Sequence, residues 1–159
     1  MQLYLVQHAE AVSKDVDPGR PLSSRGEDDA GAMATFLQQS RVEVETIVHS
    51  GKMRAHQTAE LLAEKILLQG DVAAIPGINP DDPVDVFAAK VSQLRHNTMI
   101  VGHLPFMARL VSLLVSGNPE DTLVAFSPGT VVCLEHVPEE GWRVSWMIRP
   151  ELVNHRISG

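Results

Sequence analysis

The hydrophobic and polar positions of the chain follow two patterns, short apolar runs and apolar stripes with helical spacing. The short runs predict strands over residues 3–6, 46–48, 72–75 and 98–101. The stripes recur every three or four residues and predict helices over residues 27–39, 53–69, 84–94 and 104–114. Two later runs, 130–137 and 142–148, flank a Pro-Glu-Glu-Gly turn and predict a hairpin.

Residues at the expected helix ends support these boundaries. Ser23 or Ser24 can cap the first helix, the second of them with Glu27 as a capping box. The pair Asp82-Pro83 is typical of a cap followed by proline at the first helical position. Gly70 is expected to end the second helix.

Strands that alternate with helices and then end in a hairpin predict an α/β fold. We expect a three-layer α/β/α sandwich, with a mostly parallel sheet covered on both faces and the C-terminal hairpin as its antiparallel edge. No repeat, linker or low-complexity tract interrupts the pattern, so residues 1–159 are expected to form a single domain.

Composition narrows the range of functions. The 159 residues carry a formal net charge of −7, which argues against a general nucleic-acid binder. A single cysteine, Cys133, excludes an intramolecular disulfide framework and a thiolate metal cluster, and we expect its thiol to be buried and inert. No apolar run approaches the ~18 residues that span a bilayer, and the first residues lack a basic leader, so we expect a cytoplasmic protein.

Three of the predicted strands run directly into polar residues. His8 follows the first strand, Arg54 lies shortly after the second, and His103 follows the strand at 98–101. Because ligands of open parallel sheets bind beyond the carboxyl ends of the strands, the three side chains would share one edge if their strands are neighbours. Taken singly, each histidine is more often a surface or capping residue than a functional one.

Two cations stand at the start of the second predicted helix, Lys52 and Arg54. The helix dipole is already positive there, so cations are mildly unfavourable unless an anion binds between them and the backbone N–H groups. The alternative is that both side chains extend into water.

These segments resemble the motifs of the histidine phosphatase superfamily, and the short chain is similar to its SixA-type phosphohistidine phosphatases. Residues 5–11 (Leu-Val-Gln-His-Ala-Glu-Ala) match a strand followed by Arg-His-Gly, and residues 20–26 (Arg-Pro-Leu-Ser-Ser-Arg-Gly) match Arg-Pro-Leu-Thr-x-x-Gly. Residues 50–59 (Ser-Gly-Lys-Met-Arg-Ala-His-Gln-Thr-Ala) match Ser-Pro-x-x-Arg-Ala-x-Gln-Thr-Ala. Residues 101–105 (Val-Gly-His-Leu-Pro) match the motif of the second histidine.

The resemblance implies a phosphoglycerate mutase-like fold and a role for each matching residue. His8 is the implied nucleophile, which would form a phosphohistidine intermediate that water hydrolyses. His103 and Arg54 are the implied catalytic partners that bind the phosphoryl oxygens, and Arg20 matches a further phosphate-binding arginine. Such a pocket neutralises charge without a metal or another cofactor.

The first motif departs from the family pattern at two positions. Gln7 stands where the family has arginine, and Ala9 stands where it has glycine. Gln7 can still donate a hydrogen bond to phosphate, but the loss of a charge-assisted bond weakens binding by about 1.5–3 kcal/mol. We therefore expect weakened rather than abolished activity.

The chain also lacks an obvious general acid. Many relatives place a carboxylate after the third strand, whereas residues 75–80 contain none before Asp81 and Asp82. An alkoxide leaves poorly without a proton, and the imidazole of phosphohistidine leaves well, so a phosphoramidate substrate is favoured over a sugar phosphate. Glu10 stays open as an alternative acid.

The short chain leaves little room for lids, and an open pocket suits a phosphohistidine presented by another protein. The implied partner is a phosphorylated histidine-containing phosphotransfer protein; a nucleic acid, a membrane or a mutase reaction is not expected, and the oligomeric state stays open. Two other functions stay open as well, a non-catalytic phosphate-recognition module with a degraded first motif and a small-molecule phosphomonoesterase.

The remaining histidines and tryptophans are expected to be structural. The histidines outside the matched pair show no metal-ligand spacing, so we predict no metal site; they are His49, His56, His96, His136 and His155. His56 is expected on a different helix face from Arg54. Trp142 and Trp146 lie at strand period and are expected to pack in the core.

Overall fold

The computed structural model describes residues 1–154. Ten helices and strands follow one another in the predicted order, and a short 3-10 helix covers Pro150–Leu152. Their bounds are β1 Gln2–Gln7, α1 Ser24–Gln39, β2 Thr46–His49, α2 Met53–Ile66, β3 Ala73–Ala74, α3 Val84–Val91, β4 Thr98–Gly102, α4 Phe106–Ser116, β5 Val131–Val137 and β6 Gly141–Ile148.

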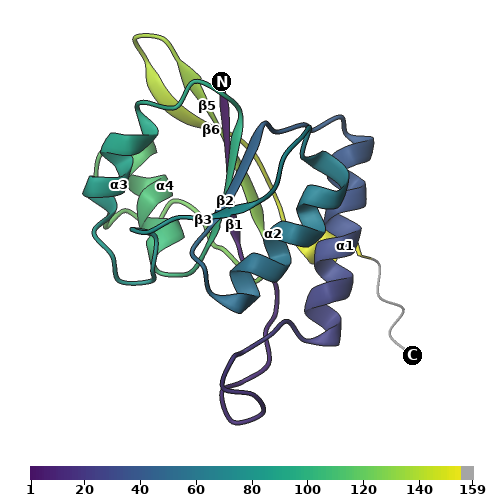
Figure 1. Ribbon diagram of the computed structural model, residues 1–159. Helices are drawn as coiled ribbons and strands as arrows, with labels where there is room; N and C mark the ends of the chain where they lie inside the picture. The colour runs from purple at the N-terminus through teal and green to yellow at the C-terminus, as the bar shows by residue number, and fades with distance from the viewer. Residues whose placement is uncertain (155–159) are drawn as a thin grey trace.

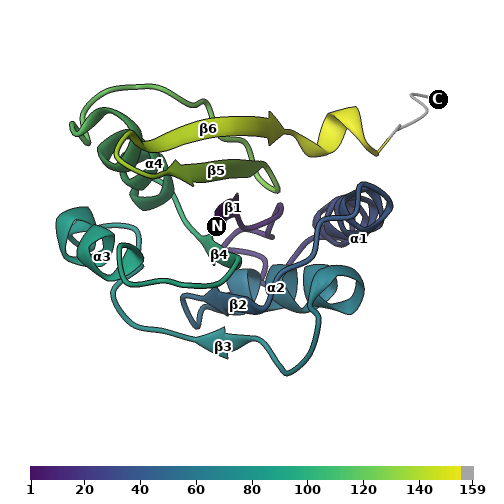
Figure 2. The ribbon, with the colours of Figure 1, turned by 90° about the horizontal axis from the view of Figure 1, so that it is seen from above.

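The strands form one six-stranded sheet in the order β3-β2-β4-β1-β5-β6. Strand β4 pairs in parallel with both β1 and β2, and β3 adds to β2 in parallel. Strand β5 pairs antiparallel with β1 and with β6, which confirms a mostly parallel sheet with an antiparallel C-terminal hairpin. Helices α1 and α2 lie on one face and α3 and α4 on the other (Figures 1 and 2), so the predicted three-layer sandwich is confirmed.

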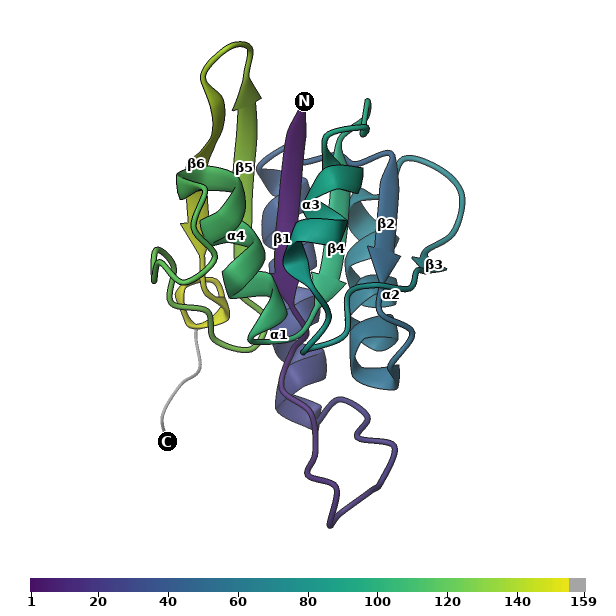
Figure 3. The ribbon, with the colours of Figure 1, turned by 90° about the vertical axis from the view of Figure 1, so that its left-hand side faces the viewer.

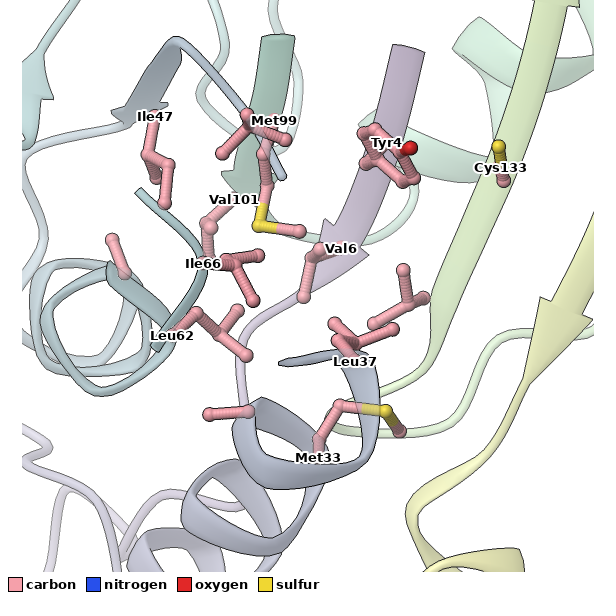
Figure 4. Packing of buried hydrophobic residues seen from close by; sticks show 14 of the residues in the cluster. Tyr4, Val6, Met33, Leu37, Ile47, Leu62, Ile66, Met99, Val101 and Cys133 are labelled. Carbon is pink, nitrogen blue, oxygen red and sulfur yellow. The ribbon is translucent and has the colours of Figure 1, made fainter. Parts of the chain in front are cut away.

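Two apolar clusters hold the layers together, and strand alternation assigns residues to each. In β1, Tyr4 and Val6 face α1 and α2, whereas Leu3 and Leu5 face α3 and α4. Figure 4 shows the first cluster, where the side chains of α1 and α2 meet those of the strands. Cys133 lies in this cluster as a free buried cysteine, and burial raises the pKa of its thiol to about 12, in line with an inert thiol.

Of the two predicted caps of α1, the structure selects Ser23, whose hydroxyl accepts the Gly26 N–H at 3.0 Å. Two other predictions are wrong in detail. Asp82 does not cap α3; its carboxylate accepts the Asn79 N–H at 2.8 Å, and the helix begins only at Val84. The third strand has two residues where four were expected.

Helix α2 ends at Ile66, three residues before the predicted end. The chain leaves the helix there because the Leu68 N–H donates to the Val44 carbonyl at 3.0 Å, in a short bridge that extends the sheet edge. Gly70 then adopts a φ of +86°, so it serves a turn beyond the helix rather than the helix end itself.

The two tryptophans of β6 pack on opposite faces of the sheet. A shift in register between β5 and β6 pairs Cys133 with Trp146 and the next residue, Leu134, with Val144. One extra residue of β6 lies between these pairs and reverses the alternation. Trp146 therefore packs against the first cluster and Trp142 against the second, and both are partly buried as core residues.

No helix within residues 1–154 has the length and apolar character required to cross a bilayer.

Candidate active site

The strand ends that were predicted to be neighbours lie next to one another. Strand β4 lies between β1 and β2 and is parallel to both, so the carboxyl ends of the three strands meet at one edge of the sheet. The rings of His8 and His103 lie there with their centroids 5.0 Å apart. Arg54 and Arg20 are close enough to lower the pKa of both histidines. The structure therefore brings these four predicted residues together.

His8 follows β1 and is anchored by its own backbone neighbour. Its Nδ1 lies 2.7 Å from the Ala9 carbonyl oxygen. A carbonyl can only accept, so Nδ1 carries the proton and Nε2 keeps a lone pair. Burial lowers the pKa of His8, the bond to Ala9 opposes this, and the charges of Arg54 and Arg20 add to the lowering, so that the pKa is about 4. At neutral pH the ring is uncharged and keeps a lone pair on Nε2.

His103 is more deeply buried, with 2% of its surface exposed, and is anchored through the opposite nitrogen. Its Nε2 lies 2.6 Å from the Ser50 hydroxyl, and its Nδ1 is buried without a hydrogen-bond partner. Burial lowers the pKa of His103 to about 3, and His8 and Arg54 add to the effect. The His103 ring is therefore neutral at pH 7.

We assign the proton of His103 to Nδ1. The Ser50 hydroxyl oxygen accepts the Lys52 N–H over 3.4 Å, and the hydroxyl can donate its own proton to His103 Nε2. The ring proton of His103 then lies on Nδ1, as a donor for an anion. Sequence reasoning gave Ser50 no role, although it opens the quoted Ser-x-x-x-Arg motif; that motif was the signal that could have found it.

Arg54 lies in the first turn of α2, where no side chain caps the helix and no acidic residue occurs. Burial, and then the charge of Arg20, lower the pKa of the Arg54 guanidinium. Within residues 1–154, three buried side-chain polar atoms have no hydrogen-bond partner: Gln7 Oε1, Arg54 Nε and His103 Nδ1. All three belong to this edge. Buried polar groups normally have partners, so such a concentration indicates a binding site.

Arg20 reaches the edge from the long loop between β1 and α1, which projects beyond the strand ends in Figure 3. Its φ is +48°, and its Nε donates to the Val12 carbonyl at 3.1 Å. Two side chains of α2 fasten this loop. Gln57 accepts the Leu22 N–H at 2.7 Å, and Thr58 accepts the Ala9 N–H at 3.0 Å.

The two departures in the first motif fit the fold differently. Ala9 is fully buried beside Leu22 and Ala30, and no positive φ occurs at this position, so its methyl group fits an ordinary backbone. Gln7 is 8% exposed and pairs with Gly102 of β4. Its amide is the polar group that stands in place of a guanidinium at this edge.

The nearest candidate acid in sequence to His8 is Glu10. It forms an ion pair with Arg25 at 3.6 Å and lines a hollow with it. No Asp or Glu contributes to the shifted pKa of His8 or His103. The segment after β3 contributes Ile78 to the core instead of an acid to the site.

Packing explains why position 102 is occupied by glycine. A Cβ built on it would lie 2.8 Å from the Met107 sulfur, so the backbone at this position packs closely against α4. His56 contacts His49, with 3.2 Å between His56 Nδ1 and His49 Nε2.

Across residues 1–154 no group of three or more candidate ligands is arranged for a metal ion; His155 lies outside the described residues.

Comparisons with known proteins agree with this arrangement. Residues 3–74 match the model of the histidine phosphatase superfamily (branch 1). The chain is 28% identical over 123 residues to phosphohistidine phosphatase SixA of Escherichia coli (strain K12). The matched region covers 74% of this chain and 76% of that protein.

Solved structures share the fold. A structure of the protein histidine phosphatase SixA complexed with tungstate superimposes with a TM-score of 0.82 at 24% identity, over 94% of this chain and 97% of that one. The alpha-ribazole phosphatase from Shigella flexneri superimposes with a TM-score of 0.77 at 19% identity, over 94% and 97% of the two chains.

Proposed function

Because the chain belongs to the histidine phosphatase superfamily, we propose that it hydrolyses phosphohistidine on a partner protein, with His8 as the nucleophile. The observation that carries this proposal is the pair of neutral histidines at the strand ends. His8 offers an Nε2 lone pair, and His103 offers an Nδ1–H, with ring centroids 5.0 Å apart. A nucleophile and an oxyanion donor side by side are what phosphoryl transfer requires.

The reaction proceeds in two displacements. In the first, the His8 Nε2 lone pair forms a bond to phosphorus, and the bond from phosphorus to the substrate imidazole breaks. The substrate ring leaves as neutral imidazole, since its other nitrogen carries a proton. In the second, a water oxygen attacks phosphorus, the bond to His8 breaks, and a water proton goes to the released phosphate. His8 returns to its Nδ1–H form, held by the Ala9 carbonyl.

The remaining residues stabilise the transferring phosphoryl group. Arg54 and Arg20 supply positive charge, His103 donates from Nδ1, and the Gln7 amide supplies a weaker, neutral hydrogen bond. Two of the unpaired buried atoms, Arg54 Nε and His103 Nδ1, are nitrogens that can donate to an anion there without a metal ion, whereas the third, Gln7 Oε1, is an acceptor. Loss of the motif arginine at Gln7 is expected to leave the enzyme slower than relatives that have it.

Substrate choice follows from the leaving group and the surface. Within residues 1–154, no Asp or Glu contributes to the shifted pKa of either histidine, which favours a leaving group such as imidazole that needs no acid. Exposed apolar side chains belong to the same edge: Val16 in the projecting loop, Met53 beside Arg54, and Leu104 beside His103. Such residues fit a protein surface better than a sugar. We therefore propose a histidine-containing phosphotransfer domain as the partner, in the cytoplasm.

The test is a single-turnover reaction with a phosphotransfer domain carrying labelled phosphohistidine. We expect release of phosphate in the presence of EDTA, and an acid-labile, alkali-stable adduct on His8 in quenched samples analysed by mass spectrometry. Phosphate binding without any turnover would instead identify a recognition module. Faster turnover of sugar phosphates than of the phosphoprotein would identify a phosphomonoesterase.

A further inference from the structure

The turn that carries Ser50 is held by a histidine outside the site described above. His49, the last residue of β2, is buried, and its Nδ1 accepts the Gly51 N–H at 3.0 Å. The bond spans two residues, as in the turns in which an Asn or Asp side chain accepts the N–H two positions on. Gly51 has a φ of +92°, which glycine adopts without strain.

This turn differs from the one in the family motif. The motif has proline after its serine, and this chain has Gly51. Proline fixes φ near −65° and has no N–H, so it needs no acceptor. Glycine leaves φ free and adds an N–H that must find a partner. His49 provides that partner and thereby replaces the rigidity that the motif obtains from proline.

The tautomer of His49 is fixed from its other side. Since Nδ1 accepts, the proton is on Nε2, which lies 3.2 Å from His56 Nδ1. His56 then carries its proton on Nε2, which lies 3.4 Å from a carboxylate oxygen of Glu60 one helical turn away. Burial lowers the pKa of His49, with His56 adding to the effect against Glu60, so the ring stays neutral at pH 7. In this series from Gly51 through His49 and His56 to Glu60, each N–H faces an acceptor atom.

We propose that His49 is a positioning residue that holds the turn at Gly51, so that the Ser50 hydroxyl faces His103 and keeps the His103 proton on Nδ1. The functional part of this proposal rests on the proposed phosphatase activity. The path is short: Ser50 lies between His49 and Gly51 in sequence and 2.6 Å from His103 Nε2.

Two substitutions separate this role from a general contribution to folding. His49→Asn keeps an oxygen that can accept the Gly51 N–H, and His49→Leu keeps the bulk without an acceptor. Both lose the bond to His56, so the difference between them isolates the bond to Gly51. His56→Leu is the matched control, because it removes the outer link and keeps the bond to Gly51.

The first readout is the ¹⁵N NMR signal of the His103 ring nitrogens, which reports the tautomer without any turnover. We expect protonated Nδ1 in wild type, His49→Asn and His56→Leu, and a mixture of tautomers in His49→Leu. The second readout is single-turnover kinetics, where His49→Leu is expected to lose about tenfold in the chemical rate, with a smaller change in KM, and the other two variants less than about threefold.

An unchanged His103 tautomer in a folded His49→Leu variant would overturn the proposal, as would equal losses in His49→Asn and His49→Leu. Wild-type protein gives a check if the variant does not fold: a proton on His49 Nδ1 contradicts the bond from Gly51. An inactive wild type with the expected tautomers refutes the proposed phosphatase function and leaves the positioning by His49 standing.

Discussion

The ends of β1 and β4 each present a histidine at the same edge, yet the two rings are anchored through opposite nitrogens. His8 is held by the Ala9 backbone carbonyl at Nδ1, and His103 by the Ser50 hydroxyl at Nε2. The ring nitrogen without an anchoring partner has a lone pair in His8, whereas in His103 it carries a proton and can donate. In the proposed mechanism, the anchoring partner rather than the residue type decides which ring attacks phosphorus and which binds its oxygens.

Removing each ring in turn is expected to have the largest effects on turnover. His8→Ala is expected to lower turnover by more than about 1,000-fold and to leave no phosphoenzyme, because the nucleophile is gone. His103→Leu is expected to cost about 100-fold while a trace of phosphoenzyme persists, the effect of losing one oxyanion donor. Rapid-quench single turnovers measure both. The control is His96→Ala, whose side chain is 71% exposed. Equal losses in the two variants would contradict the assignment of roles.

A smaller change tests the anchor rather than the ring. Ser50→Ala leaves His103 in place but removes the hydroxyl that holds Nε2. Loss of one hydrogen bond, about 1 kcal/mol, predicts a rate lower by about five- to tenfold. Ser13→Ala, in the exposed part of the projecting loop, is the matched control and should retain the wild-type rate. A Ser50→Ala rate equal to that of the control would show that Ser50 does not set the tautomer.

Much of the fold was predictable because apolar spacing follows burial on each face of the sheet. The continuous apolar run over residues 3–6 predicted a strand, and the structure buries Leu3 and Leu5 on one face of the sheet and Tyr4 and Val6 on the other. The end of α2 was not predictable, because it depends on a bond to Val44 some twenty residues earlier. Such pairings between distant segments leave no periodic signal.

The gathering of His8, Arg54 and His103 was predictable from their position after strands, given that β4 lies between β1 and β2. Their hydrogen-bond partners were not. The bond from Ser50 to His103 joins residues 53 apart in sequence, and no propensity encodes it. The same holds for Gln57 and Thr58, whose bonds to the loop after β1 depend on the final packing.

The end of β1 differs from the family motif in charge, because Gln7 replaces the motif arginine. Gln7→Arg restores the motif guanidinium and is expected to tighten binding of inorganic phosphate by about threefold or more, since a charge-assisted bond replaces a neutral one. Gln39→Arg, on the exposed end of α1, adds the same charge far from the site and is the control. Isothermal titration with phosphate measures both. Unchanged or weaker phosphate binding in Gln7→Arg would show that the site is built around glutamine.

The last prediction concerns stability, whose dependence on pH is expected to differ between the two histidines. In the unfolded chain both have an ordinary pKa near 6.5, whereas burial holds the pKa of His8 at about 4 and of His103 at about 3 in the folded protein. Below pH 6.5 the unfolded state therefore binds protons that the folded state does not. Their contribution to stability is complete above pH 6.5 and falls as the pH falls, by up to about 1.4 kcal/mol per pH unit for each ring.

Urea unfolding between pH 7 and pH 3.5 can separate the two rings. We expect His8→Ala and His103→Leu each to show a shallower loss of stability than wild type between pH 6 and pH 4.5, because one of the two proton-binding differences is gone. Below about pH 4 the folded protein begins to protonate His8, so the His8→Ala slope should approach that of wild type while His103→Leu stays shallower. Slopes identical to wild type in both variants would mean that neither ring is held neutral by burial, and the lone pair assigned to His8 would lose its physical basis.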